Sequence, residues 1–132
     1  MTSESGNDCL DRFQSEVGKL LIRNSNILDI MTKIQISCAK LCRSAVKSAT
    51  GCGCTCITGG KNETEEQDYF LSKGSTGVDG KLCDECKGII EGELGETLFY
   101  IASLCNAFDL SMKEIAEKEA KNMNVLGKYS LR

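Results

Sequence analysis

Hydrophobic residues recur every three or four positions over four stretches of this chain, which is the spacing of a buried helix face. The first stretch carries Leu10, Phe13, Val17, Leu20 and Leu21. The second covers residues 26–49 and the third about 83–107. The fourth begins after Ser111, which forms the pattern of a capping box with Glu114. The sequence therefore predicts an all-α fold with four main helices in a bundle.

The middle of the chain breaks this pattern. Residues 50–62 hold three cysteines and four glycines, and no helix is expected to continue through them. A short acidic helix or turn is expected at 63–72, followed by a glycine-rich loop at 73–80. We therefore expect a single domain over residues 1–132, with 50–82 as a Cys/Gly-rich loop inserted between helices 2 and 3.

Composition narrows the class of protein. The chain contains no Pro and no Trp, and only 5% of its residues are aromatic, so long helices and an aliphatic core are expected. No apolar run approaches the roughly 20 residues of a membrane span, and the polar N-terminus does not resemble a signal peptide. We therefore expect a cytoplasmic protein that makes no contact with a membrane.

Cysteine is the chemically informative residue. The chain has nine cysteines and no histidine. An odd count in a reducing compartment favours metal or redox chemistry over a disulfide framework. Since imidazole is absent, a metal site must be built from thiolates, perhaps with a carboxylate, and catalysis by histidine is excluded.

Two close cysteine pairs have the spacing of a metal site. Cys52 and Cys54 flank Gly53 in the loop, and Cys83 and Cys86 lie at the start of the third helix. Four such sulfurs can surround one zinc ion at about 2.3 Å and leave no position open for a substrate. Cys86 falls in the first helical turn, where free N–H groups favour a thiolate. The sequence thus predicts a closed, structural zinc site that staples the loop.

Other uses of the cysteines stay open at this point. An iron–sulfur cluster or reversible dithiol chemistry would use the same four residues, and Cys56 can replace Cys54. Cys38, Cys42 and Cys105 fall on apolar helix faces, so core packing is expected for them. A metal is the simplest source of order for residues 50–82, because this segment has few apolar side chains to bury. Structural zinc contributes about 10 kcal/mol or more of apparent binding free energy in small peptides.

A carboxylate pair offers a second candidate site. Glu93 and Glu96 are three residues apart on the third helix and can hold Mg²⁺ through oxygen, although a solvated acidic face is the simpler interpretation. The stretch from Glu93 to Asn122 resembles the second half of the MazG-like nucleotide pyrophosphohydrolases, with Glu93, Glu96 and the pair Lys121-Asn122 at matching positions. The resemblance implies Mg²⁺-dependent hydrolysis of nucleoside triphosphates. That family needs a second Glu-x-x-Glu on the preceding helix, and residues 26–49 offer only Asp29, so a degenerate site is implied.

The chain as a whole resembles a group of small uncharacterised bacterial proteins, chiefly from Gram-positive anaerobes. The segments that carry this resemblance are Asp11-Arg-Phe-Gln14, Leu21-Ile-Arg23, Ile27-Leu-Asp29, Cys52-Gly-Cys54, Cys83-x-x-Cys86, Leu98-Phe-Tyr100, Leu104-Cys-Asn106 and Leu126-Gly-Lys128-Tyr-Ser-Leu-Arg132. This similarity implies no assigned activity.

These patterns favour a non-enzymatic, zinc-stabilised interaction or regulatory protein, with no catalytic and no cofactor-binding residues. The alternatives are a MazG-like pyrophosphohydrolase and a thiol redox switch that uses the four cysteines. Residues 1–60 are net basic and residues 61–120 strongly acidic, so the two halves, or two chains arranged head to tail, should attract one another. Long amphipathic helices with few aromatic residues indicate self-association, so a homo-oligomer that buries the third and fourth helices, or a protein partner, is expected. Nucleic acid is not an expected partner, because no aromatic residue is interleaved with Lys33, Lys40, Arg43 and Lys47.

Overall fold

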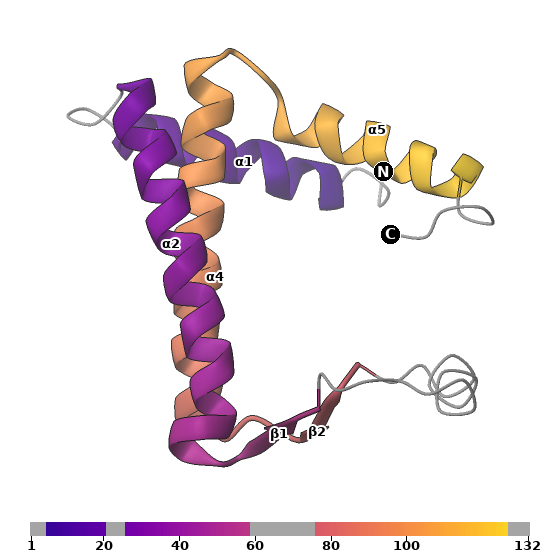
Figure 1. Ribbon diagram of the computed structural model, residues 1–132. Helices are drawn as coiled ribbons and strands as arrows, with labels where there is room; N and C mark the ends of the chain where they lie inside the picture. Colours follow the sequence, from indigo (N-terminus) through magenta and orange to yellow (C-terminus); the bar gives the residue numbers. More distant parts are fainter. Residues whose placement is uncertain (1–4, 21–25, 59–75, 127–132) are drawn as a thin grey trace. The chain divides into compact units, whose positions relative to one another are not determined.

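The computed structural model describes residues 5–20, 26–58 and 76–126, and helices dominate them (Figure 1). The elements in chain order are α1 (Ser5–Leu20), α2 (Ile27–Lys47), the π-helical turn η2 (Ser48–Cys52), β1 (Thr55–Ile57), β2 (Val78–Gly80), α4 (Asp84–Ala107) and α5 (Met112–Leu126). The predicted all-α class with four main helices is confirmed, and the cysteine-rich segment lies between α2 and α4, as expected. None of the helices within the described ranges is long and apolar enough to cross a membrane.

The chain divides into two compact units. Unit 1 comprises residues 1–36 and 96–132, and unit 2 comprises residues 37–95. The boundaries between the units fall inside α2 and α4, so each of these helices has one part in unit 1 and the other in unit 2.

Unit 1 has a small apolar core. Val17 of α1, Ile30 of α2, and Ala102 and Cys105 of α4 are almost fully buried. Helix α2 begins at an Asn cap, since the Asn26 Oδ1 atom accepts a hydrogen bond from the backbone N–H of Leu28 at 2.8 Å. Burying a Val or Ile side chain stabilises a fold by about 1.5–3 kcal/mol, so this core can hold unit 1 together.

Backbone hydrogen bonds and a helix cap fix the turn between α4 and α5, a corner of the chain in unit 1. Asp109 adopts a left-handed conformation with φ 57°. The N–H of Leu110 donates to the Cys105 carbonyl at 2.8 Å, and the N–H of Asp109 donates to the Asn106 carbonyl at 3.2 Å. These two bonds form a Schellman motif that ends α4. Ser111 then caps α5 by accepting a hydrogen bond from the Glu114 N–H at 3.2 Å, which confirms the predicted cap.

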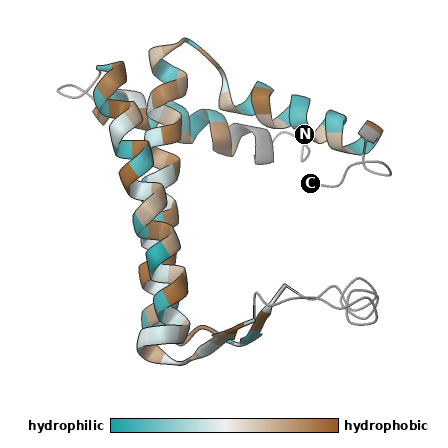
Figure 2. Cartoon of the chain, in the orientation of Figure 1, coloured by the Kyte–Doolittle hydropathy of each residue, from teal (hydrophilic) through white to brown (hydrophobic). Residues whose placement is uncertain are grey.

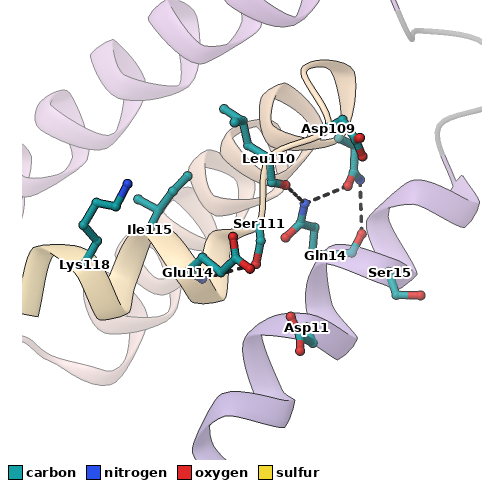
Figure 3. A pocket seen from close by; sticks show the side chains of 10 residues that line it. Asp11, Gln14, Ser15, Asp109, Leu110, Ser111, Glu114, Ile115 and Lys118 are labelled. Atoms are coloured by element: carbon teal, nitrogen blue, oxygen red, sulfur yellow. Dashed lines mark hydrogen bonds between the residues drawn. The ribbon is translucent and has the colours of Figure 1, made fainter.

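Gln14 fastens α1 to this corner (Figure 3). Its amide nitrogen donates to the Leu110 carbonyl at 2.6 Å and to the Asn106 Oδ1 atom at 2.9 Å. Its amide oxygen accepts a hydrogen bond from the Met112 N–H at 2.8 Å. One side chain of α1 thus bonds a side chain near the end of α4, a backbone carbonyl of the turn and the first backbone N–H of α5.

Unit 2 contains a short hairpin that the sequence did not predict. Strands β1 and β2 pair antiparallel, with Thr55 opposite Gly80 and Ile57 opposite Val78. The N–H of Thr58 extends the pairing by donating to the Gly77 carbonyl at 2.8 Å. The helical conformation also continues through Cys52 as η2, so the expectation that no helix enters residues 50–62 was wrong for the first three of them. The predicted acidic helix or turn at 63–72 lies outside the described residues.

Unit 2 lacks a buried apolar core in the ranges that the structure describes. Its buried side chains there are Ser37, Ser48 and Thr55, which all carry a hydroxyl group. Cys38 and Cys42 are exposed, so the prediction that they pack in a core was wrong, whereas Cys105 in unit 1 is buried as predicted. Hydrophobic burial therefore gives unit 2 little to hold its hairpin against its helices.

Candidate metal centre

Four cysteine sulfurs converge in unit 2. The Sγ atoms of Cys52, Cys54, Cys83 and Cys86 all lie within 4.8 Å of one another. Cys52 ends η2, Cys54 follows two residues later, Cys83 directly precedes α4, and Cys86 lies in the first turn of α4. The structure thus brings together the four residues that the sequence singled out.

Cys52 and Cys54 lie on the first of two segments that form the centre, called here the first arm (residues 48–55). The backbone and side chain of Ser48 fix the conformation of this arm. Its carbonyl accepts the N–H of Gly53 at 2.9 Å and lies 3.6 Å from the Cys54 sulfur. Gly53 has φ 85°, a left-handed conformation that costs glycine least. This reverses the chain between the two cysteines and directs both sulfurs to one point. The buried Ser48 hydroxyl also hydrogen-bonds the Thr55 hydroxyl at 2.6 Å, which links η2 to β1.

The second arm begins at the N-terminus of α4, where Cys83 acts as the helix cap. Its sulfur accepts the backbone N–H of Cys86 at 3.4 Å, and its carbonyl accepts the N–H of Lys87 at 2.8 Å. The hydrogen bond from the Cys86 backbone, aided by the Cys86 thiol, lowers the pKa of Cys83 to about 7. Cys83 is therefore the readiest thiolate of the group.

The neighbouring thiols respond in the opposite direction. The hydrogen bond with the Cys83 sulfur raises the pKa of Cys86 to about 12, and the Cys52 pKa is also raised, mainly by its own contact with Cys83. The sequence-based prediction that Cys86 is the favoured thiolate was wrong, because the cap position belongs to Cys83. A thiolate at Cys83 is a suitable starting point for binding a soft cation, which displaces the remaining thiol protons when it binds.

The spacing of the sulfurs fits one tetrahedral ion. Four sulfurs at about 2.3 Å from a central zinc are separated from one another by about 3.8 Å. The Cys52 and Cys83 sulfurs, which come from different arms, are already 3.8 Å apart. Every other pair lies within 4.8 Å, so shifts of at most about 1 Å complete the tetrahedron.

The hairpin supports the first arm from outside. Gly80 of β2 has φ 84°, and a Cβ atom at this position would lie 2.7 Å from the Cys54 carbonyl oxygen. Only glycine allows β2 to approach the Cys54 backbone this closely. Cys56 lies in β1, is exposed and does not belong to the convergent group. The structure therefore favours Cys54 over Cys56 as the fourth member of the cluster.

The carboxylate pair is arranged differently. In the residues that the structure describes, the four cysteines are the one group of three or more potential metal-ligating side chains that converge. The Glu93 carboxylate lies 3.7 Å from the Lys40 ammonium group and is largely shielded from solvent. The Lys40–Glu93 ion pair lies within unit 2 and gives Glu93 a structural role. Binding of Mg²⁺ by Glu93 and Glu96 stays a prediction.

The described residues also line two hollows, one in each unit. In unit 1, a cavity of about 610 Å³ between α1 and the start of α5 is lined by polar side chains that include Asp11, Asp109, Glu114 and Lys118 (Figure 3). In unit 2, a hollow of about 250 Å³ beside the hairpin has a mainly apolar lining with Ala45, Ile57, Val78, Leu82 and Ile90. Sequence reasoning found neither, because each lining combines residues that are far apart in the chain.

Comparisons with protein-family models, with curated proteins and with solved structures give no match for this chain. The two family resemblances therefore stay predictions.

Proposed function

We propose that Cys52, Cys54, Cys83 and Cys86 bind one zinc ion that organises unit 2, in a non-enzymatic interaction or regulatory protein. The observation that supports this proposal is the convergence of four sulfurs from two distant stretches of chain within 4.8 Å. Twenty-eight residues separate Cys54 from Cys83 in the sequence, so the centre closes a long loop. Closing such a loop costs conformational entropy that bonds to a metal can offset.

The ligand chemistry favours zinc. Thiolates are soft ligands, which select zinc, copper(I) or iron over the oxygen-preferring Mg²⁺ and Ca²⁺. In an iron–sulfur cluster the four cysteines are divided among two or four iron atoms joined by bridging sulfides, so sulfurs on different irons stand farther apart than sulfurs around one ion. Here all four sulfurs lie within 4.8 Å of one another. The 3.8 Å separation between Cys52 and Cys83 matches a single tetrahedral ion.

A centre of this kind serves structure. Four protein ligands fill a tetrahedral zinc ion and leave no open position for water or substrate. The described part of unit 2 buries only hydroxyl-bearing side chains, so the metal supplies the stabilisation that a core would otherwise give. The ion would join the end of η2 to the start of α4 and hold the hairpin between them.

A thiol redox switch is the second candidate, since one observation favours it. The exposed Cys52 sulfur lies 3.8 Å from Cys83, the thiol with the lowered pKa. A low-pKa thiol beside a second thiol is the arrangement that forms disulfides most readily. The zinc proposal predicts metal-bound protein with four protected thiols, whereas the switch predicts metal-free protein with a reversible Cys52–Cys83 disulfide.

Elemental analysis of anaerobically purified protein tests the two candidates. We expect one zinc per chain, and a loss of that zinc in Cys54→Ser. Cys56→Ser is the matched control, because Cys56 lies two residues away and outside the cluster. Metal-free wild-type protein, or equal zinc contents in Cys54→Ser and Cys56→Ser, would overturn the proposal.

A further inference from the structure

An exposed apolar stripe follows α2 within unit 2. Cys38, Cys42 and Val46 are spaced four residues apart, so they form one ridge on the helix surface. All three are exposed, with Val46 at 50%. The buried Ser37 and Ser48 mark a different face of the helix. The hydrophobic ridge of α2 is therefore turned away from the interior of unit 2.

Helix α4 carries a matching exposed residue in unit 2. Leu94 is 45% exposed. The ion pair between Lys40 and Glu93 marks one side of the α2–α4 pair. At about 100° per residue, Cys42 lies nearly opposite Lys40 on α2, and Leu94 lies a quarter turn from Glu93 on α4. Helices α2 and α4 run antiparallel (Figure 1). Cys42 and Leu94 therefore lie on the same side of the helix pair, away from the Lys40–Glu93 ion pair.

These residues define one surface, the outer α2–α4 face, made of Cys38, Cys42, Val46 and Leu94. Figure 2 shows hydrophobic residues along the length of both helices, interrupted by hydrophilic ones. Exposed apolar side chains gathered on one side of a helix pair are typical of an interaction site in a folded protein.

The charges of unit 2 indicate what covers this face. The α2 part, residues 37–47, carries three basic side chains and no acidic one; these are Lys40, Arg43 and Lys47. The α4 part, residues 84–95, carries four acidic side chains and only Lys87 as a basic one; the acidic residues are Asp84, Glu85, Glu91 and Glu93. A basic helix beside an acidic helix is self-complementary, because a two-fold axis that sets α2 against α4 of another copy joins opposite charges twice.

We propose that the outer α2–α4 face binds a second copy of this chain, with α2 packed across α4 of the partner. The apolar ridge forms the centre of the contact. Arg43 of α2 and Glu91 of α4 are both exposed, so each can approach its opposite in the partner. The inference is independent of the zinc proposal, since none of these residues belongs to the cysteine centre.

Leu94→Glu is the variant that tests the proposal, and Ile89→Glu is its control. Both leucine and isoleucine lie on α4 and are similarly exposed, at 45% and 49%. Leu94 is five positions after Ile89, so the two side chains point about 140° apart on the helix. By sedimentation velocity we expect the chain as purified to dimerise, Leu94→Glu to weaken dimerisation by about 30-fold or more, and Ile89→Glu to change it by less than about threefold.

Two further readouts guard against a trivial loss of folding. Both variants must keep the zinc content and circular dichroism of the wild type, which separates failure of the dimer from failure of the metal centre.

Arg43→Glu and Glu91→Arg are each expected to weaken the dimer, and their combination to restore it. In the dimer, Cys38 and Cys42 are expected to alkylate more slowly as protein concentration rises, while the exposed Cys9 of α1 keeps its rate.

A wild-type chain that remains monomeric up to about 100 μM, well above the micromolar Kd of a weak specific contact, would overturn the proposal. Equal effects of Leu94→Glu and Ile89→Glu would overturn it as well, because the contact would then not involve the outer α2–α4 face. A charge-reversed double variant no stronger than its parents would contradict the pairing of α2 with α4.

Discussion

Lowering the free zinc concentration is expected to unfold unit 2 while unit 1 keeps its structure. Unit 1 buries Val17 and Ile30 and is fastened by Gln14. In unit 2 the described buried side chains are all polar, so its order depends on the metal. Two backbone amides report on unit 2, namely Gly53 bonded to Ser48 and Thr58 bonded to Gly77.

The size of the effect follows from mass action. A ligand that binds only the folded state stabilises it by RT ln(1 + [L]/Kd), which is about 2.7 kcal/mol at 100 times Kd and about 4.1 kcal/mol at 1,000 times Kd. Each tenfold fall in free zinc therefore lowers the opening free energy of unit 2 by about 1.4 kcal/mol. Exchange of the Gly53 and Thr58 amides should accelerate about tenfold per decade of free zinc.

Hydrogen exchange read by mass spectrometry or NMR in zinc buffers measures this directly. The reference amide in unit 1 is Leu110, whose N–H donates to the Cys105 carbonyl in the Schellman motif. Its exchange should not depend on zinc, and in Cys54→Ser the zinc dependence at Gly53 and Thr58 should vanish. The reasoning is refuted if all three amides respond to zinc alike, or if none does.

Three further predictions concern individual side chains. Ser48→Ala in the zinc-loaded protein should cost about 1–3 kcal/mol by denaturant unfolding, because it leaves the Thr55 hydroxyl unpaired; adding Thr55→Val should recover part of this loss, and a purely additive loss would contradict the pairing. Asp109→Gly should raise the free energy of unfolding by about 0.5–1 kcal/mol, since glycine adopts φ 57° without strain, whereas a lower stability would show that the aspartate side chain matters more than its backbone. Burial raises the pKa of the Cys105 thiol, so its thiolate forms at higher pH than that of a small thiol in water; its alkylation should rise at higher pH than that of N-acetylcysteine in the same buffer, and coincident pH profiles would argue against the burial.

The helices could be predicted because their signals are local. Apolar spacing predicted the extents of α2 and α4 to within two residues at most, and Ser111 marked the start of α5 through cap chemistry that depends on a single side chain. The convergence of the cysteines also followed from local spacing, since each pair can reach one ion and the two pairs lie at opposite ends of one loop.

The features that sequence reasoning missed depend on contacts across the chain or on a single residue of register. Strands β1 and β2 have three residues each and pair across 20 intervening residues, so they leave no periodic signal. A helix start one residue later than expected made Cys83, not Cys86, the capping thiolate. On α2 the apolar arc is wider than the buried face, and the small Ser37 and Ser48 occupy buried positions, so hydrophobicity alone placed Cys38 and Cys42 inside.

Zinc K-edge X-ray absorption on the anaerobically purified, full-length protein tests the cysteine centre most directly. We expect one zinc per chain with four sulfur neighbours at about 2.3 Å and no nitrogen or oxygen neighbour. The spectrum should persist in Cys56→Ser and change in Cys52→Ser, where one sulfur is lost. A wild-type spectrum with fewer than four sulfurs, or a preparation without metal, would contradict the account.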